Sequence, residues 1–294
     1  MRVAVIVNPA SGRAPSPDRT RRRADLAGAI LMAEGVEPEV LVSQHPGHAR
    51  ELAQEAIARG ASIVFAWGGD GTVNEVGSAV AFGEAALAIV PAGSGNGLAR
   101  ALKIPRDPAA ALRHGLARPV RRIDVGEIDG RLFLNIAGVG FDARIAERFA
   151  REGGKRGLRG YAVAVARELF TYRAEPCQLT IDSCVHARTA FLLVIANGPQ
   201  WGNGASVAPG ARLDDGLLDL VSVAPRSPLR AMLQIRHLFT GTFARLPGVT
   251  TQRVSNLEIA GRPPVAFHVD GQPGSCTTGT IAVRVHPLAL GVCA

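Results

Sequence analysis

The sequence is poor in aromatic residues and cysteine. Aromatic residues make up 5% of the 294 positions and do not alternate with basic residues, so a base-stacking surface for nucleic acid is not expected. The cysteines lack the close pairs and accompanying histidines of a zinc site. They are Cys177, Cys184, Cys276 and Cys293. We therefore expect reduced, structural cysteines and no nucleic-acid partner.

Long apolar runs are also missing. No run approaches the roughly 20 residues that a membrane-spanning helix requires. The first residues, Met1-Arg2 followed at once by the apolar segment Val3 to Val7, do not resemble a secretory signal. We expect a cytoplasmic protein without a transmembrane segment, so any contact with a membrane would be peripheral.

Lysine is nearly absent, although the formal net charge is +8. The only lysines are Lys103 and Lys155, so arginine supplies almost all of the positive charge. A phosphate site in this chain must therefore rely on backbone amides and guanidinium groups. The basic balance also permits attraction to an anionic membrane surface.

Glycine, in contrast, is concentrated in two turns between Ser62 and Arg100. The apolar run from Ile63 to Trp67 precedes Gly68-Gly69-Asp70-Gly71-Thr72-Val73-Asn74-Glu75, and the run from Leu87 to Val90 precedes Pro91-Ala92-Gly93-Ser94-Gly95-Asn96-Gly97. Backbone without side chains can approach phosphate oxygens closely, and a following helix adds its positive end. Two such turns close together predict a polyphosphate site.

Asp70 lies between glycines in the first of these turns. A carboxylate among phosphate-binding amides suits Mg²⁺ or a hydroxyl nucleophile. The alternative is that Asp70 is a plain turn residue. The second turn and the hydroxyls of Thr72 and Ser94 favour the functional interpretation.

The first 119 residues alternate between strand-like and helical patterns, which predicts a parallel sheet with helices on its faces. In such sheets ligands bind at the carboxyl ends of the strands. We therefore place a nucleotide at the rim where the strand ends converge. The candidate binding residues there are Asn8, Ser11, Gly12, Ser43, Gly68, Gly69, Asp70, Gly71, Thr72, Asn74, Gly93, Ser94 and Asn96.

From about residue 120 to 286 the pattern changes to short apolar and alternating segments separated by glycines, one of which runs from Leu132 to Ala137. This texture predicts a second, mainly β domain, a sandwich. Helices are expected from Ala143 to Tyr172 and from Pro228 to Thr240.

Two turns of the second domain carry carboxylates. The turn from Arg212 to Leu217 contains Asp214-Asp215-Gly216; an oxygen-rich cation site is one interpretation, but its spacing alone favours an ordinary turn. Asp270 ends a strand, where it either faces an interdomain cleft or forms a hairpin turn.

These motifs resemble the diacylglycerol kinase catalytic-domain family, which includes sphingosine kinases and bacterial YegS-like lipid kinases. The resemblance covers nearly the whole chain, and the order and spacing of its motifs are highly specific. The matching motifs are Asn8-Pro9-x-Ser11-Gly12, Gly68 to Glu75, Pro91-x-Gly93-Ser94-Gly95-Asn96, Gly138-Val139-Gly140-Phe141-Asp142, Leu213-Asp214-Asp215-Gly216 and Asp270-Gly271.

The resemblance implies ATP-dependent phosphorylation of a lipid hydroxyl in the cleft between the two domains, with residues 287–294 packing back on the first. It implies ATP contacts at Asn8, Ser43, Gly68 to Asn74 and Ser94. It also implies a Mg²⁺ site at Asp215 with the backbone carbonyls of Arg212 and Leu217, which replaces the ordinary-turn interpretation.

The expected catalytic residues are Asp70, Asp270 and Gln272. Asp70 and Asp270 would position the metal or the attacking hydroxyl. Gln272 stands where family members commonly carry a Glu that is a proposed general base. The alternatives are a catalytically silent nucleotide- or lipid-binding regulator and an NAD kinase-like enzyme, which shares the Gly-Gly-Asp-Gly turn.

A basic, glycine-flanked loop precedes an apolar helix in the second domain. Its residues Lys155, Arg156 and Arg159 are expected to contact anionic lipid headgroups, and a solvated linker is the alternative.

Overall fold

The computed structural model describes residues 1–12, 16–151 and 158–294. By its contacts the chain divides into two compact units, Met1–Val125 with Pro287–Ala294 and Gly126–His286. The basic loop with Lys155 and Arg156 lies outside the described residues.

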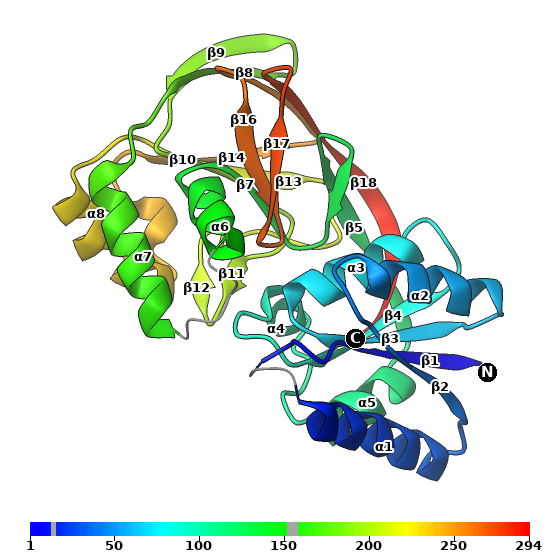
Figure 1. The fold of residues 1–294 in the computed structure, drawn as a ribbon. Helices are drawn as coiled ribbons and strands as arrows, with labels where there is room; N and C mark the ends of the chain where they lie inside the picture. Colours follow the sequence, from blue (N-terminus) through cyan, green and yellow to red (C-terminus); the bar gives the residue numbers. More distant parts are fainter. Residues whose placement is uncertain (13–15, 152–157) are drawn as a thin grey trace. The chain divides into compact units, whose positions relative to one another are not determined.

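Unit 1 is built from alternating strands and helices (Figure 1). Its elements are β1 (Val3–Val7), α1 (Pro17–Ala33), β2 (Pro38–Val42), α2 (His48–Ala58), β3 (Ile63–Gly68), α3 (Asp70–Val80), β4 (Ala86–Pro91), α4 (Gly97–Ala101), α5 (Pro108–Ala117), the first part of β5 (Val120–Ile128) and the end of β18 (Thr280–Cys293).

The sheet of unit 1 is parallel, in the order β2-β1-β3-β4, and the end of β18 adds a further parallel strand beside β4. Every residue of β1 and β3 is buried, because α1 and α5 cover one face and α2 and α3 the other (Figure 1). The strands end level with one another: Val7 pairs with Val42 and with Trp67. The predicted α/β fold is confirmed, and the residues after these strands share one edge.

The last residues of the chain are held in unit 1 by strand pairing and by a side chain. Gly291 and Val292 of β18 pair with Ala86 and Leu87 of β4. The backbone N–H of Leu288 donates to Oδ1 of buried Asp124 at 2.7 Å.

Unit 2 is mainly antiparallel β structure. Its elements are the rest of β5, β6 (Arg131–Phe133), β7 (Ile136–Gly140), α6 (Phe141–Arg151), α7 (Leu158–Thr171), β8 (Pro176–Ile181), β9 (Cys184–Thr189), β10 (Leu192–Ala196), β11 (Gln200–Gly202), β12 (Ala205–Ser206), β13 (Leu218–Val223), α8 (Pro228–Gln234), α9 (Arg236–Phe239), a 3-10 turn η1 (Phe243–Arg245), β14 (Val249–Val254), β15 (Asn256–Ala260), β16 (Val265–Val269), β17 (Gln272–Cys276) and the first part of β18.

Two sheets of unit 2 enclose one apolar core. One sheet contains β18, β15, β8 and β9, and the other runs β14-β13-β10-β7-β16-β17. Side chains of both meet in a single buried cluster, with Ile259 and Ile281 from the first sheet and Ile195 and Phe267 from the second. The predicted β-sandwich is confirmed.

Strand β10 is apolar throughout because both of its faces are covered. Leu193 and Ile195 enter the sandwich core, whereas Leu192 and Val194 enter a second cluster on the opposite face, together with Phe243. Successive side chains of a strand point to opposite faces, so such a strand shows no polar alternation.

Three predicted elements differ from those observed. Helix α3 begins at Asp70, so Asp70 occupies a first helical turn. The helix expected from Pro228 to Thr240 is two short helices with Ile235 between them. The strand expected from Leu132 to Ala137 is split into β6 and β7, because the intervening amides bond to a side chain, as described below.

The described part of the chain includes all four cysteines, and none is joined in a disulfide. None of the described helices has both the length and the apolar content needed to cross a bilayer.

The packing of α5 on the sheet generates a testable prediction. A Cβ at Gly115 would lie 2.5 Å from Cε1 of Phe65, a fully buried ring. Gly115→Ala should therefore lower the free energy of unfolding by about 1–2 kcal/mol, although alanine favours helices. Gly28 of α1 is the matched control, since a Cβ there meets nothing within 4 Å. Gly28→Ala should raise stability by about 0.5–1 kcal/mol. Urea unfolding of both variants tests this, and equal shifts in one direction would contradict it.

Candidate functional site

The turn after β1 is tied to the start of α3. The side-chain amide of Asn8 donates to Oγ1 of Thr72 at 2.8 Å, and its Oδ1 accepts from the Ala10 amide at 2.8 Å. Arg23 donates to the backbone oxygen of Asn8 and to Oγ of Ser11, both at 2.9 Å. This leaves a fixed turn with a guanidinium group beside it.

Burial, and the nearby Arg19, lower the pKa of Arg23. A guanidinium remains protonated despite such a shift. Arg23 therefore supplies a permanent positive charge next to the first strand end, in a chain where lysine is scarce.

The two glycine-rich turns touch each other. A Cβ on Gly93 would lie 2.6 Å from Cα of Gly69, and a Cβ on Gly68 would lie 2.3 Å from Oγ1 of Thr72. Gly12 has a left-handed φ of +88°, and a Cβ there would lie 3.0 Å from the backbone oxygen of Ala92. The structure thus brings the ends of β1, β3 and β4 together, and glycine is required by close backbone approach.

Asp70 bridges the two turns. Its Oδ2 accepts from the Asn96 amide at 2.8 Å and its Oδ1 from the Gly97 amide at 2.6 Å. Hydrogen bonds to a carboxylate are stronger than neutral ones. The sequence suggested a carboxylate directed at a ligand; the structure shows one that holds the second turn against the first.

Asn96 closes the second turn upon itself. It adopts a left-handed φ of +51°, its Oδ1 accepts from the Gly93 amide at 2.9 Å, and its Nδ2 donates to the Gly93 oxygen at 2.8 Å. Ser94 is exposed at the tip, whereas Ser43, Thr72 and Asn74 are buried. The turn is preorganised before any ligand arrives.

Helix α3 begins within this cluster of turns. Its N-cap is Gly69, which offers no side-chain cap, and the positive end of the helix dipole lies among these turns. Glu75, in the middle of the same helix, accepts from the amides of Gly47 and Ala49 at 3.0 and 3.2 Å and so caps α2. Glu75 was not among the expected site residues, and its contacts are structural.

In unit 2, Asp270 and Gly271 form a two-residue hairpin between β16 and β17. Val269 pairs with Gln272, and the φ values of Asp270 and Gly271 are +47° and +84°. This is the Asp-Gly pattern of a tight hairpin turn. The hairpin turn that was one interpretation of the sequence is observed.

The Asp270 carboxylate organises the backbone between β6 and β7. It accepts from the amides of Leu134, Asn135 and Ile136 at 2.9, 3.1 and 2.9 Å. These bonds replace strand pairing and explain why the expected single strand is interrupted. They make Asp270 a positioning residue for the hairpin that carries Gln272.

Gln272 is half-buried at the start of β17. Its Oε1 lies 3.5 Å from Nη2 of Arg131, whose Nη1 donates to the Pro273 oxygen at 2.8 Å. Burial lowers the pKa of Arg131. An arginine thus stands beside Gln272, the position at which the resemblance led us to expect a glutamate.

The turn at Asp215 contains an orphaned carboxylate oxygen. Oδ1 of Asp215 accepts from the Leu217 amide at 3.2 Å, whereas the buried Oδ2 has no hydrogen-bond donor. Arg253 lies 3.4 Å from Oδ2 as an ion pair without donating a hydrogen bond. The exposed Arg212 pairs instead with Asp214, at 3.3 Å. A buried carboxylate oxygen without a hydrogen-bond donor fits a hard cation such as Mg²⁺.

Asp219 supplies a second carboxylate near Asp215 and was missed by the sequence reasoning. It is buried on β13, opposite Arg253 of β14. Burial raises its pKa, Arg253 opposes the rise, and Asp215 adds to it. A cation beside the Asp219 carboxylate would offset the cost of ionising it. The sequence signal that could have identified it is its position four residues after Asp215, near the start of β13.

A buried His-Asp-Trp cluster was also missed. Nε2 of His268 lies 2.7 Å from Oδ2 of Asp142, which also accepts from Nε1 of Trp201 at 3.0 Å. The Gly271 amide donates to Nδ1 of His268 at 3.3 Å. Burial lowers the pKa of His268, but the adjacent Asp142 carboxylate outweighs it and the net shift is upward.

This cluster connects the start of α6 to the Asp270-Gly271 hairpin. A Cβ on Gly138 would lie 2.6 Å from Nε2 of His268 and 2.7 Å from Oδ2 of Asp142, so glycine is needed there. Gly138 belongs to the sequence motif from Gly138 to Asp142, and this packing explains why the motif begins with glycine. No spacing rule in the sequence links that motif to His268.

A third group of possible metal ligands lies at the start of α2. Ligand atoms of His45, His48 and Glu51 lie within 4.8 Å of one another. However, Nδ1 of His48 accepts from the Gln44 amide at 3.0 Å, so its Nε2 carries the proton in the neutral ring, and the two imidazoles are stacked. This arrangement does not favour a metal.

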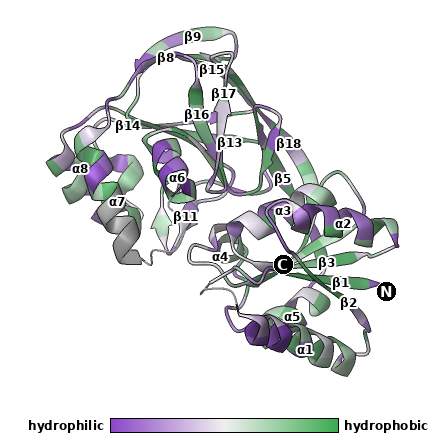
Figure 2. Ribbon diagram, viewed as in Figure 1, coloured by the Kyte–Doolittle hydropathy of each residue, from purple (hydrophilic) through white to green (hydrophobic). Residues whose placement is uncertain are grey.

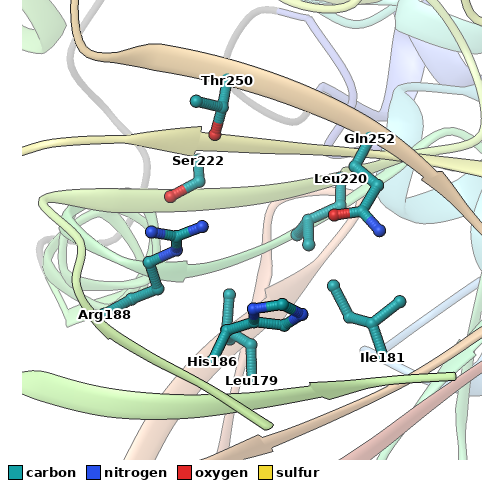
Figure 3. A pocket seen from close by; sticks show the side chains of 8 residues that line it. All are labelled: Leu179, Ile181, His186, Arg188, Leu220, Ser222, Thr250 and Gln252. Atoms are coloured by element: carbon teal, nitrogen blue, oxygen red, sulfur yellow. The ribbon is translucent and has the colours of Figure 1, made fainter. Parts of the chain in front are cut away.

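Two hollows of unit 2 lie away from the expected site residues. A cavity of about 20 Å³ separates β8 and β9 from β13 and β14 and has room only for water-sized molecules (Figure 3). It is lined by Leu179, Ile181, His186, Arg188, Leu220, Ser222, Thr250 and Gln252. A wider groove of about 530 Å³ lies beside Cys177, Arg188 and Arg262. Neither contains a residue expected to bind nucleotide or metal.

Comparison with known proteins places these motifs in a family. Residues 2–128 match the diacylglycerol kinase catalytic domain, and residues 135–294 match the YegS C-terminal NAD kinase beta sandwich-like domain. A Pseudomonas aeruginosa protein named "Probable lipid kinase YegS-like" is 36% identical over 81% of this chain and 79% of its own length. A protein of the same name from Pectobacterium atrosepticum is 31% identical over 88% of this chain and 87% of its own.

Solved structures share the fold. A diacylglycerol kinase structure from Bacillus anthracis has a TM-score of 0.74 at 22% identity, covering 99% of this chain and 96% of that one. A second structure of this kind from the same organism has a TM-score of 0.81 at 23% identity, with coverage of 99% and 94%. Together with the matches in sequence, these findings show that the chain belongs to the diacylglycerol kinase catalytic-domain family and carries the YegS-type C-terminal domain.

Proposed function

We propose that the protein is an ATP-dependent lipid kinase that transfers the γ-phosphoryl group of ATP to a lipid hydroxyl, as a cytoplasmic protein that visits the membrane surface. The observation that carries this proposal is the contact between the two glycine turns, joined by Asp70 and bordered by the start of α3. Family membership supports a lipid as the phosphoryl acceptor, because the related proteins are named probable lipid kinases.

The reaction exchanges one phosphorus–oxygen bond for another. The lipid hydroxyl oxygen bonds to the γ-phosphorus, the bond from that phosphorus to the β–γ bridging oxygen breaks, and ADP leaves. The hydroxyl proton passes to a base or to water. Such a transfer depends mainly on alignment and on stabilising charge at the phosphoryl oxygens.

The residues of unit 1 would bind and align the polyphosphate. Backbone amides of the glycine turns and the α3 N-terminus supply donors, Arg23 supplies a fixed positive charge, and Asp70 keeps the two turns in register. In unit 2, Asp270 would position the hairpin that carries Gln272.

The Asp215 turn would hold Mg²⁺, which supplies charge compensation for the phosphates. The orphaned Oδ2 of Asp215 and the second carboxylate at Asp219 fit this ion. When no cation is bound there, Arg253 offsets part of their charge.

Activity with ATP and Mg²⁺ on diacylglycerol, phosphatidylglycerol and a long-chain base tests the proposal, with NAD as a second acceptor. A phosphorylated lipid supports it, and phosphorylation of NAD alone would identify an NAD kinase. Binding of ATP without transfer to any acceptor would favour a catalytically silent regulator. That alternative is considered because Gln272 carries an amide, which cannot act as a general base.

Asp70→Asn should lower turnover about 100-fold or more with the fold retained. An amide can accept only one of the two backbone hydrogen bonds and turns its NH₂ group toward the other donor, so the turns lose alignment. The matched control is Asp107→Asn, because Asp107 also caps a helix of unit 1, accepting from Ala110, and Asn is an equally good cap. Steady-state kinetics of both variants measure the effect; equal turnover in the two would refute the role of Asp70.

Asp215→Ala should raise the Mg²⁺ concentration needed for half-maximal activity. It removes the orphaned carboxylate oxygen, whereas the control Asp214→Ala removes only an exposed partner of Arg212. A Mg²⁺ titration of activity, and of the thermal midpoint without substrate, compares the two. If both variants match the wild type in both titrations, the turn binds no functional cation.

Gln272→Glu should raise turnover, because a carboxylate can accept the hydroxyl proton and an amide cannot. General-base assistance is typically worth about 10²–10⁴-fold. Gln178→Glu, an exposed change on β8, controls for the added negative charge. A wild type that is inert while Gln272→Glu is active would mean that the native chain is the regulator and not the kinase.

A further inference from the structure

The two short helices after β13 expose apolar side chains to an unusual extent. Leu229, Leu233 and Phe239 are 67%, 65% and 60% exposed, and Met232 and Ile235 are also exposed. These five residues are named here the α8–α9 patch. Leucine and phenylalanine at this exposure, gathered on two consecutive helices, mark a surface that contacts something apolar.

The opposite side of the same helices is packed against unit 2. Ala231 of α8 lies against the cluster of Phe141, Ile145 and Leu169 on α6 and α7, and Leu238 of α9 lies against the cluster around Phe243. Figure 1 shows α8 beside α7. The helices are therefore anchored by one face, and the α8–α9 patch is the face left over.

The charge around the patch has a single sign. From residue 220 to residue 257 the chain contains no Asp or Glu, and its arginines are Arg226, Arg230, Arg236, Arg245 and Arg253. Arg230 and Arg236 are exposed and lie between the patch residues in sequence. Figure 2 shows strongly hydrophobic and strongly hydrophilic residues side by side on α8.

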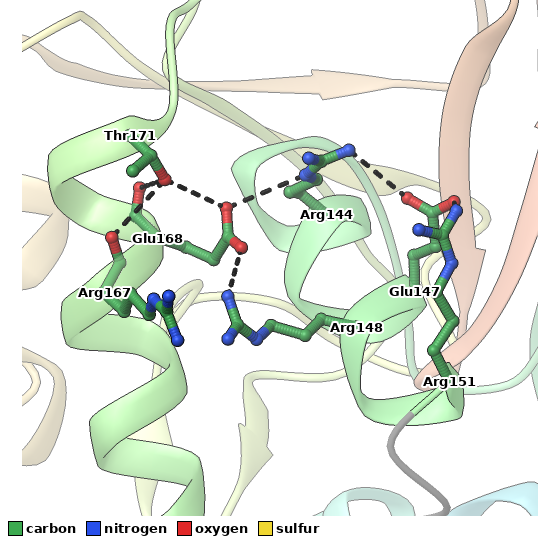
Figure 4. A network of polar contacts seen from close by, with 7 residues as sticks. All are labelled: Arg144, Glu147, Arg148, Arg151, Arg167, Glu168 and Thr171. Atoms are coloured by element: carbon green, nitrogen blue, oxygen red, sulfur yellow. Dashed lines mark hydrogen bonds and ion pairs between the residues drawn. The ribbon is translucent and has the colours of Figure 1, made fainter.

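Nearby carboxylates do not neutralise these two arginines. On α6 and α7, Glu168 pairs with Arg144 and Arg148, and Glu147 pairs with Arg144 and Arg151 (Figure 4). Arg226 is committed to the backbone oxygens of Ala224 and Gly248 and to Gln234. Among the described residues, neither Arg230 nor Arg236 forms an ion pair.

We propose that the α8–α9 patch, with Arg230 and Arg236, docks the protein on an anionic phospholipid bilayer. The apolar tips enter the acyl boundary while the guanidinium groups remain among the phosphates of the headgroups. The inference rests on the proposed function, since a lipid kinase must reach a substrate held in a membrane. It places the contact on helices that follow β13, a different segment from the loop expected from the sequence.

The charge pattern favours a bilayer over a second copy of the chain. A self-complementary interface brings like patches together, and four unpaired guanidinium groups would then meet across an apolar contact with no carboxylate to pair with. An anionic surface satisfies the arginines and the apolar tips together.

Sedimentation with vesicles tests the docking surface. The wild type should bind vesicles of mixed phosphatidylcholine and phosphatidylglycerol, bind phosphatidylcholine alone much more weakly, and lose binding as salt is added. Replacing Leu229, Leu233 and Phe239 together by Ser should weaken binding more than about tenfold. Arg230→Gln with Arg236→Gln should weaken it about 30-fold at low salt.

The matched control lies on the exposed strand β9 of the same unit. Val185→Ser with Arg188→Gln removes one exposed apolar and one exposed basic side chain and should leave vesicle binding unchanged. Binding by the triple Ser variant equal to that of the wild type would overturn the proposal. So would a wild-type dimer in lipid-free buffer that becomes a monomer in this variant, because a second copy would then cover the patch.

A fluorescence change that appears only on membrane contact tests docking without relying on a loss of binding that misfolding could also cause. Leu233→Trp adds an exposed indole, whereas Trp67 is buried and Trp201 donates to Asp142. Its emission should shift to the blue on anionic vesicles and be quenched by brominated acyl chains; emission unchanged from that in buffer would count against docking.

Activity on a water-dispersed short-chain lipid separates this inference from the proposed function. The triple Ser variant should phosphorylate that lipid at the wild-type rate while losing activity on vesicles. If the wild type binds anionic vesicles through the patch but phosphorylates no lipid, the docking surface stands and the kinase proposal fails. If it phosphorylates dispersed lipid and all variants bind vesicles alike, the kinase proposal stands and the docking surface fails.

Discussion

The two hydrogen bonds from the amides of Asn96 and Gly97 to the Asp70 carboxylate hold the candidate site together. Each glycine turn follows a different strand, and without a link between them their amides would point independently. Asp70 supplies that link across the first turn of one helix and the start of another. The glycine contact at Gly69 and Gly93 is possible only because no side chain separates the two backbones.

Unit 2 uses the same device at Asp270. Three consecutive amides, from Leu134 to Ile136, donate to its carboxylate and interrupt the strand that the sequence suggests. In both units an aspartate next to a glycine organises the backbone of a neighbouring turn. Aspartates in such positions can be indispensable to a reaction without touching the reacting atoms.

The sequence was sufficient for the fold class and for the edge of the sheet at which the candidate residues of unit 1 lie. Apolar runs of strand length, each ending in glycine and polar residues, mark parallel strands, and parallel strands end on one edge. The hydrogen bonds of Asp70 and Asp270 were not predictable, because they join residues 26 and about 135 positions apart. Local patterns carry no information on such pairs.

The same limit explains the residues that were missed. His268 and Asp142 are 126 positions apart, and only the folded sandwich brings them to 2.7 Å. Asp219 lies in an apolar strand and stands out only in the structure, where it is buried and interacts with Asp215. Helical spacing from Pro228 to Thr240 predicted one helix, but which of its apolar residues remain exposed depends on what packs against it.

The most direct test of the account is to follow the γ-phosphoryl group itself. ATP labelled with ¹⁸O at the three non-bridging γ-oxygens would be incubated with the protein, Mg²⁺ and membrane lipid, and the products analysed by mass spectrometry. The account predicts a phospholipid product that carries all three labelled oxygens and retains the lipid's own hydroxyl oxygen. Label found only in inorganic phosphate or in a phosphorylated dinucleotide, with no labelled lipid, would contradict it.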